Sequence, residues 1–152
     1  MITIVNGNLL DAKEVIIAHQ VNCMGVMGSG VAKQLRNKYP KLYIEYKEYC
    51  NRFYKPSDLL GTICYHSVFI NKRYIANLFG QLFYGTDKQY TDYAALEKCF
   101  KTLASVAKEH NFDVAMPYNI GCKLAGGDWN IVYKLIEDAF KDINVTLYKY
   151  GG

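Results

Sequence analysis

The residues from Val15 to Val21 form a nearly continuous apolar run, and this run constrains the fold more than any other feature of the chain. Such a run is typical of a β-strand that is buried on both faces, as strands of helix-covered parallel sheets are. Further apolar and β-branched runs predict additional strands at residues 2–5, 61–67, 74–78, 114–116 and 145–150. The sequence therefore predicts a sheet whose second strand has no solvent-facing side.

Helical patterns separate most of these strands. Residues 31–39 follow a glycine-rich segment, and Pro40 can open a second helix in which apolar residues recur at spacings of three and four. Residues 92–110 place apolar side chains on one helical face, and Asp128 has the position of an N-cap for a last helix. Strands that alternate with helices predict a three-layer α/β/α sandwich with a mixed, mostly parallel central sheet. No linker or repeat divides the chain, so we expect a single domain over residues 1–152.

The composition is that of an ordinary globular domain. Of 152 residues, 51% are hydrophobic and 21% are charged, which argues against disorder. No apolar run approaches the roughly 20 residues that span a bilayer, and the start MITIVNGN lacks a signal-peptide pattern. Five scattered cysteines without a CxxC pair suit reduced thiols rather than a disulfide framework or a structural zinc site. We therefore expect a cytoplasmic protein with no membrane partner and no bound metal.

The formal net charge is +4, from 18 basic and 14 acidic residues. A mild positive bias favours phosphate-bearing ligands, although it is equally typical of a solvated surface. It does not require nucleic acid, which we do not expect as a partner. Nothing in the sequence indicates an oligomer, and we expect a monomer.

Two glycine-rich loops each follow a predicted buried strand and run into a predicted helix. The first covers residues 19–30 (HQVNCMGVMGSG) and the second covers residues 117–127 (PYNIGCKLAGG). In α/β sheets, ligands bind at the carboxyl ends of the strands, where these loops lie. Glycine lets a backbone approach a ligand closely, and a helix N-terminus presents unpaired N–H groups with partial positive charge. Two such loops facing each other predict a site for a diphosphate.

Neither loop fits a common phosphate-binding pattern. A P-loop requires a lysine and then a serine or threonine after its last glycine, whereas Gly30 is followed by Val31 and Ala32. The spacing of Gly25, Gly28 and Gly30 reverses the order of the dinucleotide fingerprint. Both of these common classes are therefore excluded.

Four segments taken together resemble the macrodomain family. They are GNLL near the start, HQVNCMGVMGSGVAKQL, NLFGQ followed by YTDY, and MPYNIGCKLAGGDW. The chain is most similar to small stand-alone bacterial and phage macrodomains, and it also resembles ADP-ribose 1''-phosphate phosphatases and, more loosely, ADP-ribose protein glycohydrolases. The resemblance extends from Ile2 to Tyr148. It implies a pocket for ADP-ribose or an ADP-ribose derivative, and no cofactor.

The resemblance also implies which residues line that pocket. Asn8 takes the position of a family aspartate that accepts a hydrogen bond from the adenine amino group, and the lost charge predicts weaker adenine binding. Leu9 would contact the base through its backbone, and Tyr148 would lie against it. Lys123 replaces the usual small residue and either reaches a phosphate or points to solvent. The loops would supply the remaining contacts, from Gly28, Ser29, Gly30 and Val31 and from Ile120, Gly121, Cys122, Lys123, Leu124 and Ala125.

The catalytic patterns of two macrodomain hydrolase branches are incomplete here. Ala32 stands where one large hydrolase class carries an aspartate. The glycohydrolase branch uses a lysine and an aspartate, and the matching positions hold Gln81 and Ala125. The remaining catalytic candidates are His19 and Asn22, whose spacing in HQVN resembles the phosphatase branch.

His19 and Asn22 each allow a catalytic and a structural interpretation. An imidazole with an ordinary pKa near 6.5 can protonate a leaving oxygen or take a proton from water, but a histidine can also be held by backbone groups beneath the loop. The amide of Asn22 can position a ribose or a water molecule, or it can simply shape the loop. We expect Asp128 to cap a helix, and Cys23 and Cys122 to pack rather than react.

The resemblance thus implies a hydrolase that binds ADP-ribose and converts ADP-ribose 1''-phosphate to ADP-ribose and phosphate. One alternative is a mono-ADP-ribosyl hydrolase that acts on modified protein or nucleic acid. Another is a non-catalytic module that binds ADP-ribose or a related NAD-derived metabolite. The positive charge and the 14 tyrosines leave nucleic-acid binding as a further alternative.

Overall fold

Six strands form one sheet in the order β1-β6-β5-β2-β4-β3, in a computed structural model that describes residues 1–68, 70 and 72–150. Neighbouring strands are parallel except β3 and β4, which form an antiparallel pair at one edge. The predicted mixed, mostly parallel sheet is confirmed. The strands are β1 (Ile2–Asn6), β2 (Ile16–Asn22), β3 (Ile63–Val68), β4 (Arg73–Gln81), β5 (Val114–Pro117) and β6 (Val145–Lys149).

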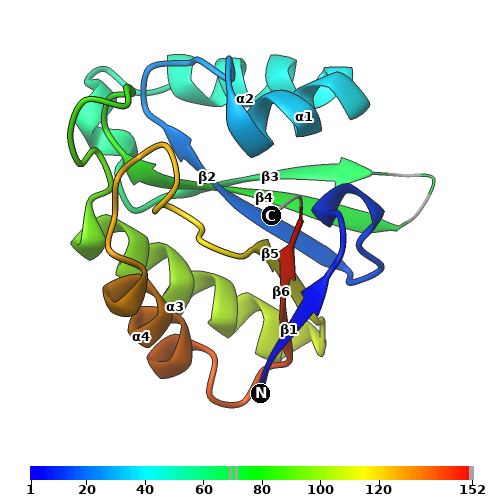
Figure 1. Ribbon diagram of the computed structural model, residues 1–152. Helices are drawn as coiled ribbons and strands as arrows, with labels where there is room; N and C mark the ends of the chain where they lie inside the picture. Colours follow the sequence, from blue (N-terminus) through cyan, green and yellow to red (C-terminus); the bar gives the residue numbers. More distant parts are fainter. Residues whose placement is uncertain (69, 71, 151–152) are drawn as a thin grey trace.

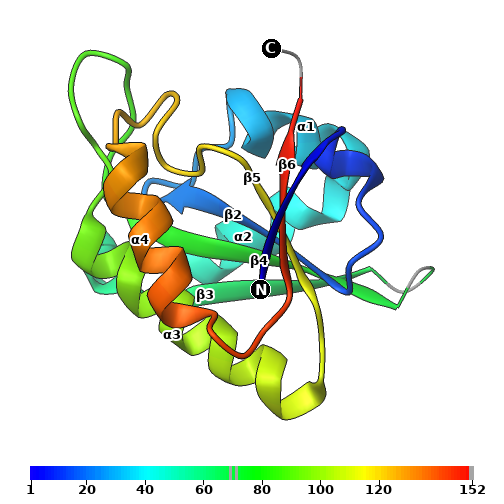
Figure 2. The same cartoon turned by 60° about the horizontal axis from the view of Figure 1, so that its bottom comes forward.

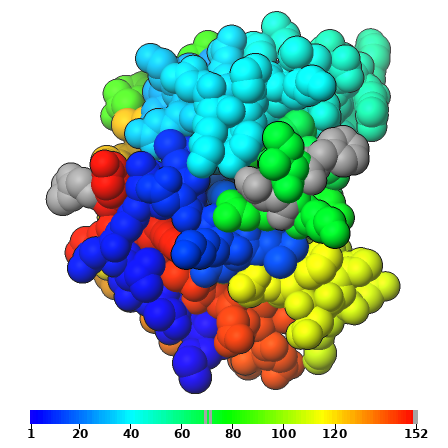
Figure 3. Space-filling view, turned by 90° about the vertical axis from the view of Figure 1, so that its right-hand side faces the viewer, coloured from blue at the N-terminus to red at the C-terminus, as the bar shows by residue number. Residues whose placement is uncertain are grey.

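Helices cover both faces of the sheet, which confirms the three-layer sandwich. The helices α1 (Gly30–Lys38) and α2 (Pro40–Asn51) lie on one face, and α3 (Tyr93–His110) and α4 (Trp129–Ala139) lie on the other (Figure 1). Figure 3 shows the layers from the side, with the cyan helices above the sheet and the end of α3 below it. Among the described residues, Leu9–Asp11 and Pro56–Leu59 form the short 3-10 helices η1 and η2. No helix in the described part of the chain is long and apolar enough to cross a bilayer.

The side chains of β2 alternate between two apolar cores. Ile16 and Ala18 belong to the core beneath α3 and α4, whereas Ile17 and Val21 belong to the core beneath α1 and α2. All four are at most 2% exposed. The strand is therefore buried on both faces, as the apolar run predicts.

Two aspartates begin the helices of the second layer. The side chain of Asp92 accepts a hydrogen bond from the Ala95 N–H at the start of α3, and Asp128 accepts one from Asn130 at the start of α4. These bonds satisfy N–H groups that have no partner within the helix. The predicted capping role of Asp128 is confirmed.

A crevice opens where β2 and β5 separate. The two strands pair only at Ile16 with Val114 and at Ile17 with Ala115, while β2 continues alongside β4 as far as Asn22. The chain leaves β2 toward α1 on one face and leaves β5 toward α4 on the opposite face (Figure 2). Such a reversal of direction is the place where open α/β sheets bind ligands. Both glycine loops therefore begin at the edge of one crevice.

Candidate functional site

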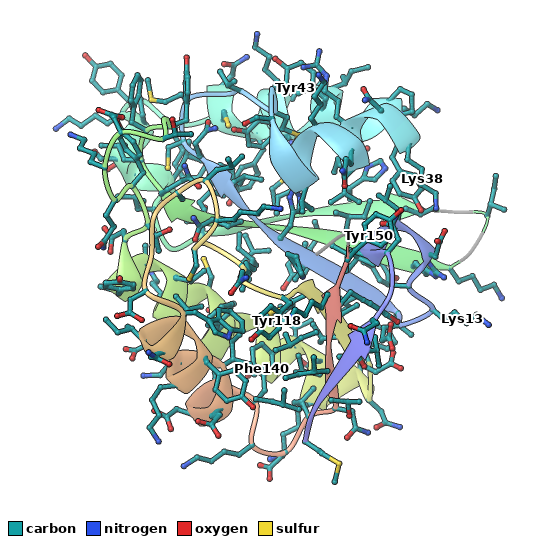
Figure 4. All side chains as sticks on the ribbon, viewed as in Figure 1. Lys13, Lys38, Tyr43, Tyr118, Phe140 and Tyr150 are labelled. Carbon is teal, nitrogen blue, oxygen red and sulfur yellow. The ribbon has the colours of Figure 1, made fainter. Side chains whose placement is uncertain are left out.

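A cavity of about 720 Å³ occupies this crevice, within the size range of ligand-binding clefts. Its walls come from the carboxyl end of β2, the start of α1 and the loop between β5 and α4. Tyr118 and Tyr150, which follow β5 and β6, also line it (Figure 4). The structure brings all the site residues expected from the sequence to this cavity, namely Asn8, Leu9, His19, Asn22, Gly28, Ser29, Gly30, Val31, Ile120, Gly121, Cys122, Lys123, Leu124, Ala125 and Tyr148.

Asn22 holds the first loop in shape. Its Oδ1 accepts hydrogen bonds from the N–H of Met24 at 3.0 Å and from the Tyr46 hydroxyl at 3.0 Å, and its Nδ2 donates to the Val26 carbonyl at 2.8 Å. Asn22 is only 8% exposed. Because most of its amide capacity is used within the protein, the geometry supports the loop-shaping interpretation over direct work on a substrate.

The start of α1 presents free N–H groups to the cavity. Ser29 is the N-cap residue, but its side chain makes no capping hydrogen bond, so the first-turn N–H groups have no cap. Gly30 has φ +59°, in the left-handed region that favours glycine. The end of this helix is therefore open to an anionic ligand, which the helix dipole also favours.

The second loop approaches the first loop closely. A Cβ atom on Gly30 would lie 3.0 Å from Cδ1 of Leu124, so only the missing side chain leaves room between the loops. In the same loop, Gly121 has φ +74°. The Cys122 thiol donates to the Ile120 carbonyl, and burial raises its pKa to about 11. That thiol is protonated at neutral pH, which fits the expected packing role.

His19 pairs with a buried asparagine on the neighbouring strand. Its Nε2 lies 2.6 Å from Oδ1 of Asn77, and the Nδ2 of Asn77 donates in turn to the Cys64 carbonyl at 3.1 Å. His19 is 1% exposed and Asn77 is fully buried. The partner of His19 is thus a side chain, not the backbone that the structural interpretation assumes.

Burial keeps the His19 imidazole neutral. The pKa of His19 falls to about 4, because burial disfavours the charged ring more than the bond to Asn77 favours it. Since an amide oxygen only accepts, the ring proton is on Nε2 and Nδ1 carries a lone pair. Nδ1 is buried and has no hydrogen-bond partner in the described chain. At neutral pH, His19 can therefore accept a hydrogen bond at Nδ1 but is a poor proton donor there.

The Asn8 end of the cavity is held by local hydrogen bonds. Oδ1 of Asn8 accepts from the Leu10 N–H at 3.0 Å and so caps η1. The Tyr148 hydroxyl donates to Glu14, and burial together with this bond raises the pKa of Tyr148 to about 12. Asn8 keeps its Nδ2 group and part of its acceptor capacity for a ligand.

The described lining of the cavity contains no acidic side chain. Lys123 on the second loop is exposed to solvent beside the cavity. Over residues 1–68, 70 and 72–150, no three His, Cys, Asp or Glu side chains lie close enough together to hold a metal ion. The arrangement offers backbone N–H groups and neutral side chains as its binding groups.

Several residues of the site are not among those expected from the sequence. Asn77, Gln20 and Thr91 form hydrogen bonds beneath the loops. Gln20 also lines the cavity, as does Tyr84 from the segment after β4. Asn77 and Thr91 lie in the segments NLFGQ and YTDY, which carry part of the family resemblance. The family resemblance is the sequence feature that points to these two residues, because neither segment contains a motif with a known chemical role.

The fold and the site together define an α/β protein with a crevice for a phosphate-bearing ligand at a topological switch point. Within this class, the chain belongs to the Macro domain family, whose model matches residues 3–136. The family indicated by the sequence motifs is confirmed.

Named relatives carry out two kinds of hydrolysis. The DNA ADP-ribosyl glycohydrolase of Mycobacterium tuberculosis is 28% identical over 166 residues, which cover 100% of this chain and 43% of that protein. The chain thus spans less than half the length of that relative. The ADP-ribose 1''-phosphate phosphatase of Lodderomyces elongisporus is 35% identical over 129 residues, covering 77% of this chain and 76% of that protein.

The solved structures agree with this family. The macrodomain of Thermus aquaticus DarG superposes with a TM-score of 0.80 at 26% identity, and the match covers 100% of this chain and 99% of that one. The predicted macrodomain-like sandwich is therefore confirmed by a structure that matches over the full chain.

Proposed function

We propose that this protein binds ADP-ribose in the cavity and hydrolyses ADP-ribose 1''-phosphate to ADP-ribose and phosphate. The observation that carries the proposal is the convergence of two glycine loops on one cavity whose described lining contains no carboxylate. The relative from Lodderomyces elongisporus, an ADP-ribose 1''-phosphate phosphatase by name, supports the reaction.

Each part of ADP-ribose can be assigned to a group of residues in the cavity. Adenine is placed beside Asn8, Leu9 and Tyr148, where the side chain of Asn8 can meet its amino group. The diphosphate is placed between the loops, against the uncapped N-terminus of α1. Lys123 is exposed and is free to reach one of the phosphates. These contacts supply binding energy at a distance from the reacting phosphate.

For the reaction, a water attacks the phosphorus of the 1''-phosphate, the bond from phosphorus to the ribose oxygen breaks, and a proton from the water ends on that oxygen. His19 acts as a hydrogen-bond acceptor for the attacking water. Asn77 holds the Nε2–H, which leaves Nδ1 as the accepting nitrogen. Nδ1 is buried in the structure, so the proposal requires that a water reach it when the ligand is bound. The loop N–H groups stabilise the charge that develops on the phosphate oxygens. The low pKa of His19 argues against the general-acid role, and Asn22 contributes by shaping the first loop.

Two measurements on the same preparation test this proposal. Isothermal calorimetry with ADP-ribose reports binding, and phosphate release from ADP-ribose 1''-phosphate reports the reaction. Binding with turnover is the expected result. Binding without turnover of any ADP-ribose derivative would show that the protein is a non-catalytic binding module. If calorimetry detects no binding heat at millimolar ADP-ribose, both the proposed binding and the proposed reaction are wrong.

A second candidate function is removal of ADP-ribose from a nucleic acid. The observation in its favour is an exposed apolar segment at Leu82, Phe83 and Tyr84, whose Tyr84 lines the cavity. The rings of Phe83 and Tyr84 stack at 4.6 Å, and aromatic surfaces of this kind stack on bases. The name of the Mycobacterium tuberculosis relative also supports it. The absence of a carboxylate from the described lining argues against it, since glycosidic bonds are normally cleaved with carboxylates.

The two candidates predict different products. Protein incubated with ADP-ribosylated single-stranded DNA and, separately, with ADP-ribosylated protein should release no free ADP-ribose if the phosphatase proposal holds. Release of ADP-ribose from DNA, abolished when Phe83 and Tyr84 are both changed to alanine, would favour the second candidate.

A further inference from the structure

A chain of side-chain hydrogen bonds joins β2 to the second glycine loop. Nε2 of Gln20 donates to Thr91 Oγ1 at 2.9 Å and to Gln81 Oε1 at 2.8 Å. The Thr91 hydroxyl then donates to the Gly121 carbonyl. The three residues come from β2, from the end of β4 and from the segment before α3, so the bonds cross three separate parts of the chain.

These bonds lie in a tightly packed space. Thr91 is 4% exposed, and a Cβ atom on Gly121 would lie 3.0 Å from Gln20 Oε1 and 3.2 Å from Thr91 Oγ1. A Cβ atom on Gly80 would overlap Gln20 Oε1. The Gln20 amide is thus enclosed between two glycines, and its position leaves little freedom to the loop backbone beside it.

The segment before α3 also holds the second glycine loop at Ala125. The N–H groups of Tyr90 and Thr91 both donate to the Ala125 carbonyl, at 2.7 Å and 3.2 Å (the adjoining loops are visible in Figures 1 and 2). The Gly121 carbonyl also accepts from the Gly127 N–H at 3.0 Å. Residues 121–125 are therefore attached at both ends to the segment that carries Thr91.

We propose that Thr91 and Gln20 are positioning residues for ligand binding: by fixing the Gly121 carbonyl, they hold residues 121–125 in the conformation that meets the diphosphate. The ligand part of this inference rests on the proposed function. The side chains of His19 and Gln20, which are successive residues of β2, lie on opposite faces of the sheet: His19 bonds to Asn77, and Gln20 bonds to Thr91 and Gln81.

The position that matches the glycohydrolase lysine has a structural role in the same set of bonds. Gln81 accepts from Gln20 at Oε1 and donates from Nε2 to the Phe83 carbonyl at 2.8 Å. A lysine there could donate to Phe83 but could not accept from Gln20. The Gln81 amide therefore connects Gln20 to the exposed aromatic segment, and it reaches the second loop only through Gln20 and Thr91. A lysine at this position would break the bond to Gln20.

The test compares Thr91→Val with Thr91→Ser. Valine keeps the shape of threonine but removes the hydroxyl, whereas serine keeps the hydroxyl, so serine should restore whatever valine loses. We expect calorimetry to show ADP-ribose binding about tenfold weaker in Thr91→Val, within about twofold of wild type in Thr91→Ser, and again about tenfold weaker in Gln20→Met. Thr62→Val is the matched control, since the Thr62 hydroxyl also donates to a carbonyl, that of Leu59, away from the cavity. It should bind ADP-ribose like wild type.

Amide NMR spectra of the ligand-free proteins provide the readout that does not depend on ADP-ribose. Thr91→Val should shift signals of residues 120–127, and Thr91→Ser should leave them close to wild type. Unshifted loop signals in Thr91→Val and Gln20→Met, or wild-type affinity in both, would overturn the positioning role. If Thr91→Val does not fold, Gln20→Met is the deciding variant. We expect Gln20→Met to fold, because the substitution also removes Oε1, a buried acceptor that has no partner in the described chain. If wild-type protein does not bind ADP-ribose, the proposed function fails, and the loop signals alone decide this inference.

Discussion

Nε2 of His19 lies 2.6 Å from Oδ1 of Asn77, between residues that are register partners on the parallel strands β2 and β4. The bond determines which ring nitrogen carries the proton and leaves Nδ1 as a buried acceptor with no partner among the described residues. The same burial that hides Asn77 from solvent makes a charged imidazole unfavourable. The chemistry available to His19 is therefore set by a residue 58 positions away in the chain.

This pairing predicts a specific dependence of stability on pH. The pKa of His19 is about 4 in the folded protein against an ordinary 6.5, so between these values the unfolded chain binds more protons. The free energy of unfolding should therefore fall as the pH drops from 6.5 to 4. At about 1.4 kcal/mol per pKa unit, the loss from this residue amounts to at most about 3 kcal/mol.

Urea unfolding at several pH values between 7 and 4 measures this effect. His19→Asn should show a flatter dependence than wild type, since asparagine does not titrate. His110→Gln is the control, because His110 lies on the exposed end of α3, and it should leave most of the dependence in place. Parallel curves for wild type and His19→Asn would contradict the buried neutral state.

The proposed reaction makes a separate prediction for His19→Ala. Turnover of ADP-ribose 1''-phosphate should fall at least 100-fold, while ADP-ribose affinity stays nearly unchanged, because the acceptor for water is lost but the loops remain. Steady-state kinetics and calorimetry on one preparation measure the two quantities. In wild type, turnover should show no titration of His19 between pH 5.5 and 8. Equal loss of turnover and affinity would assign His19 to binding or folding instead.

Asn8→Asp should strengthen ADP-ribose binding by about three- to tenfold. The single side-chain oxygen of Asn8 already accepts from the Leu10 N–H, whereas a carboxylate has a second oxygen for the adenine amino group. A hydrogen bond to a charged acceptor is also roughly twice as strong as a neutral one. Calorimetry measures the change, with Asn130→Asp, outside the cavity on α4, as the control. Unchanged or weaker binding in Asn8→Asp would remove Asn8 from the adenine contact.

The sequence predicts those features of the fold and the site that depend on residues close together in the chain. The apolar run at Val15–Val21 predicts a doubly buried strand because the alternation of side chains is a local property of the backbone. The role of Asp128 as a cap is equally local, since its partner is the N–H two residues later. The position of both glycine loops after strands of a parallel sheet predicts that they face one cavity, and the structure brings them together.

The supporting hydrogen bonds could not be predicted in this way. Asn77 meets His19 and Thr91 meets Gln20 only because of the order and register of the strands, which no local pattern determines. Before the fold is known, Gln81 is simply a missing lysine. In the structure, its amide joins Gln20 on β2 to the carbonyl of Phe83.

Asp128→Ala separates capping from catalysis. Loss of the bond from the Asn130 N–H should lower the free energy of unfolding by about 1 kcal/mol and leave phosphate release unchanged. Denaturant unfolding and the turnover assay measure the two effects. Asp138→Ala, within α4 on its exposed side, should change neither by a comparable amount. A large loss of turnover in Asp128→Ala would give this carboxylate a role in the reaction.

Gly30→Ala should damage the cavity where its two loops meet. Gly30 has φ +59°, a conformation that costs an L-residue about 1 kcal/mol, and its added Cβ would lie 3.0 Å from Leu124 Cδ1. The helix start must then shift or Leu124 must move, and either change alters the walls around the diphosphate. We expect ADP-ribose affinity to fall at least tenfold, measured by calorimetry. Gly7→Ala is the matched control, because a Cβ there would meet nothing within 4 Å. If Gly30→Ala bound ADP-ribose as tightly as Gly7→Ala, the diphosphate could not lie between these loops.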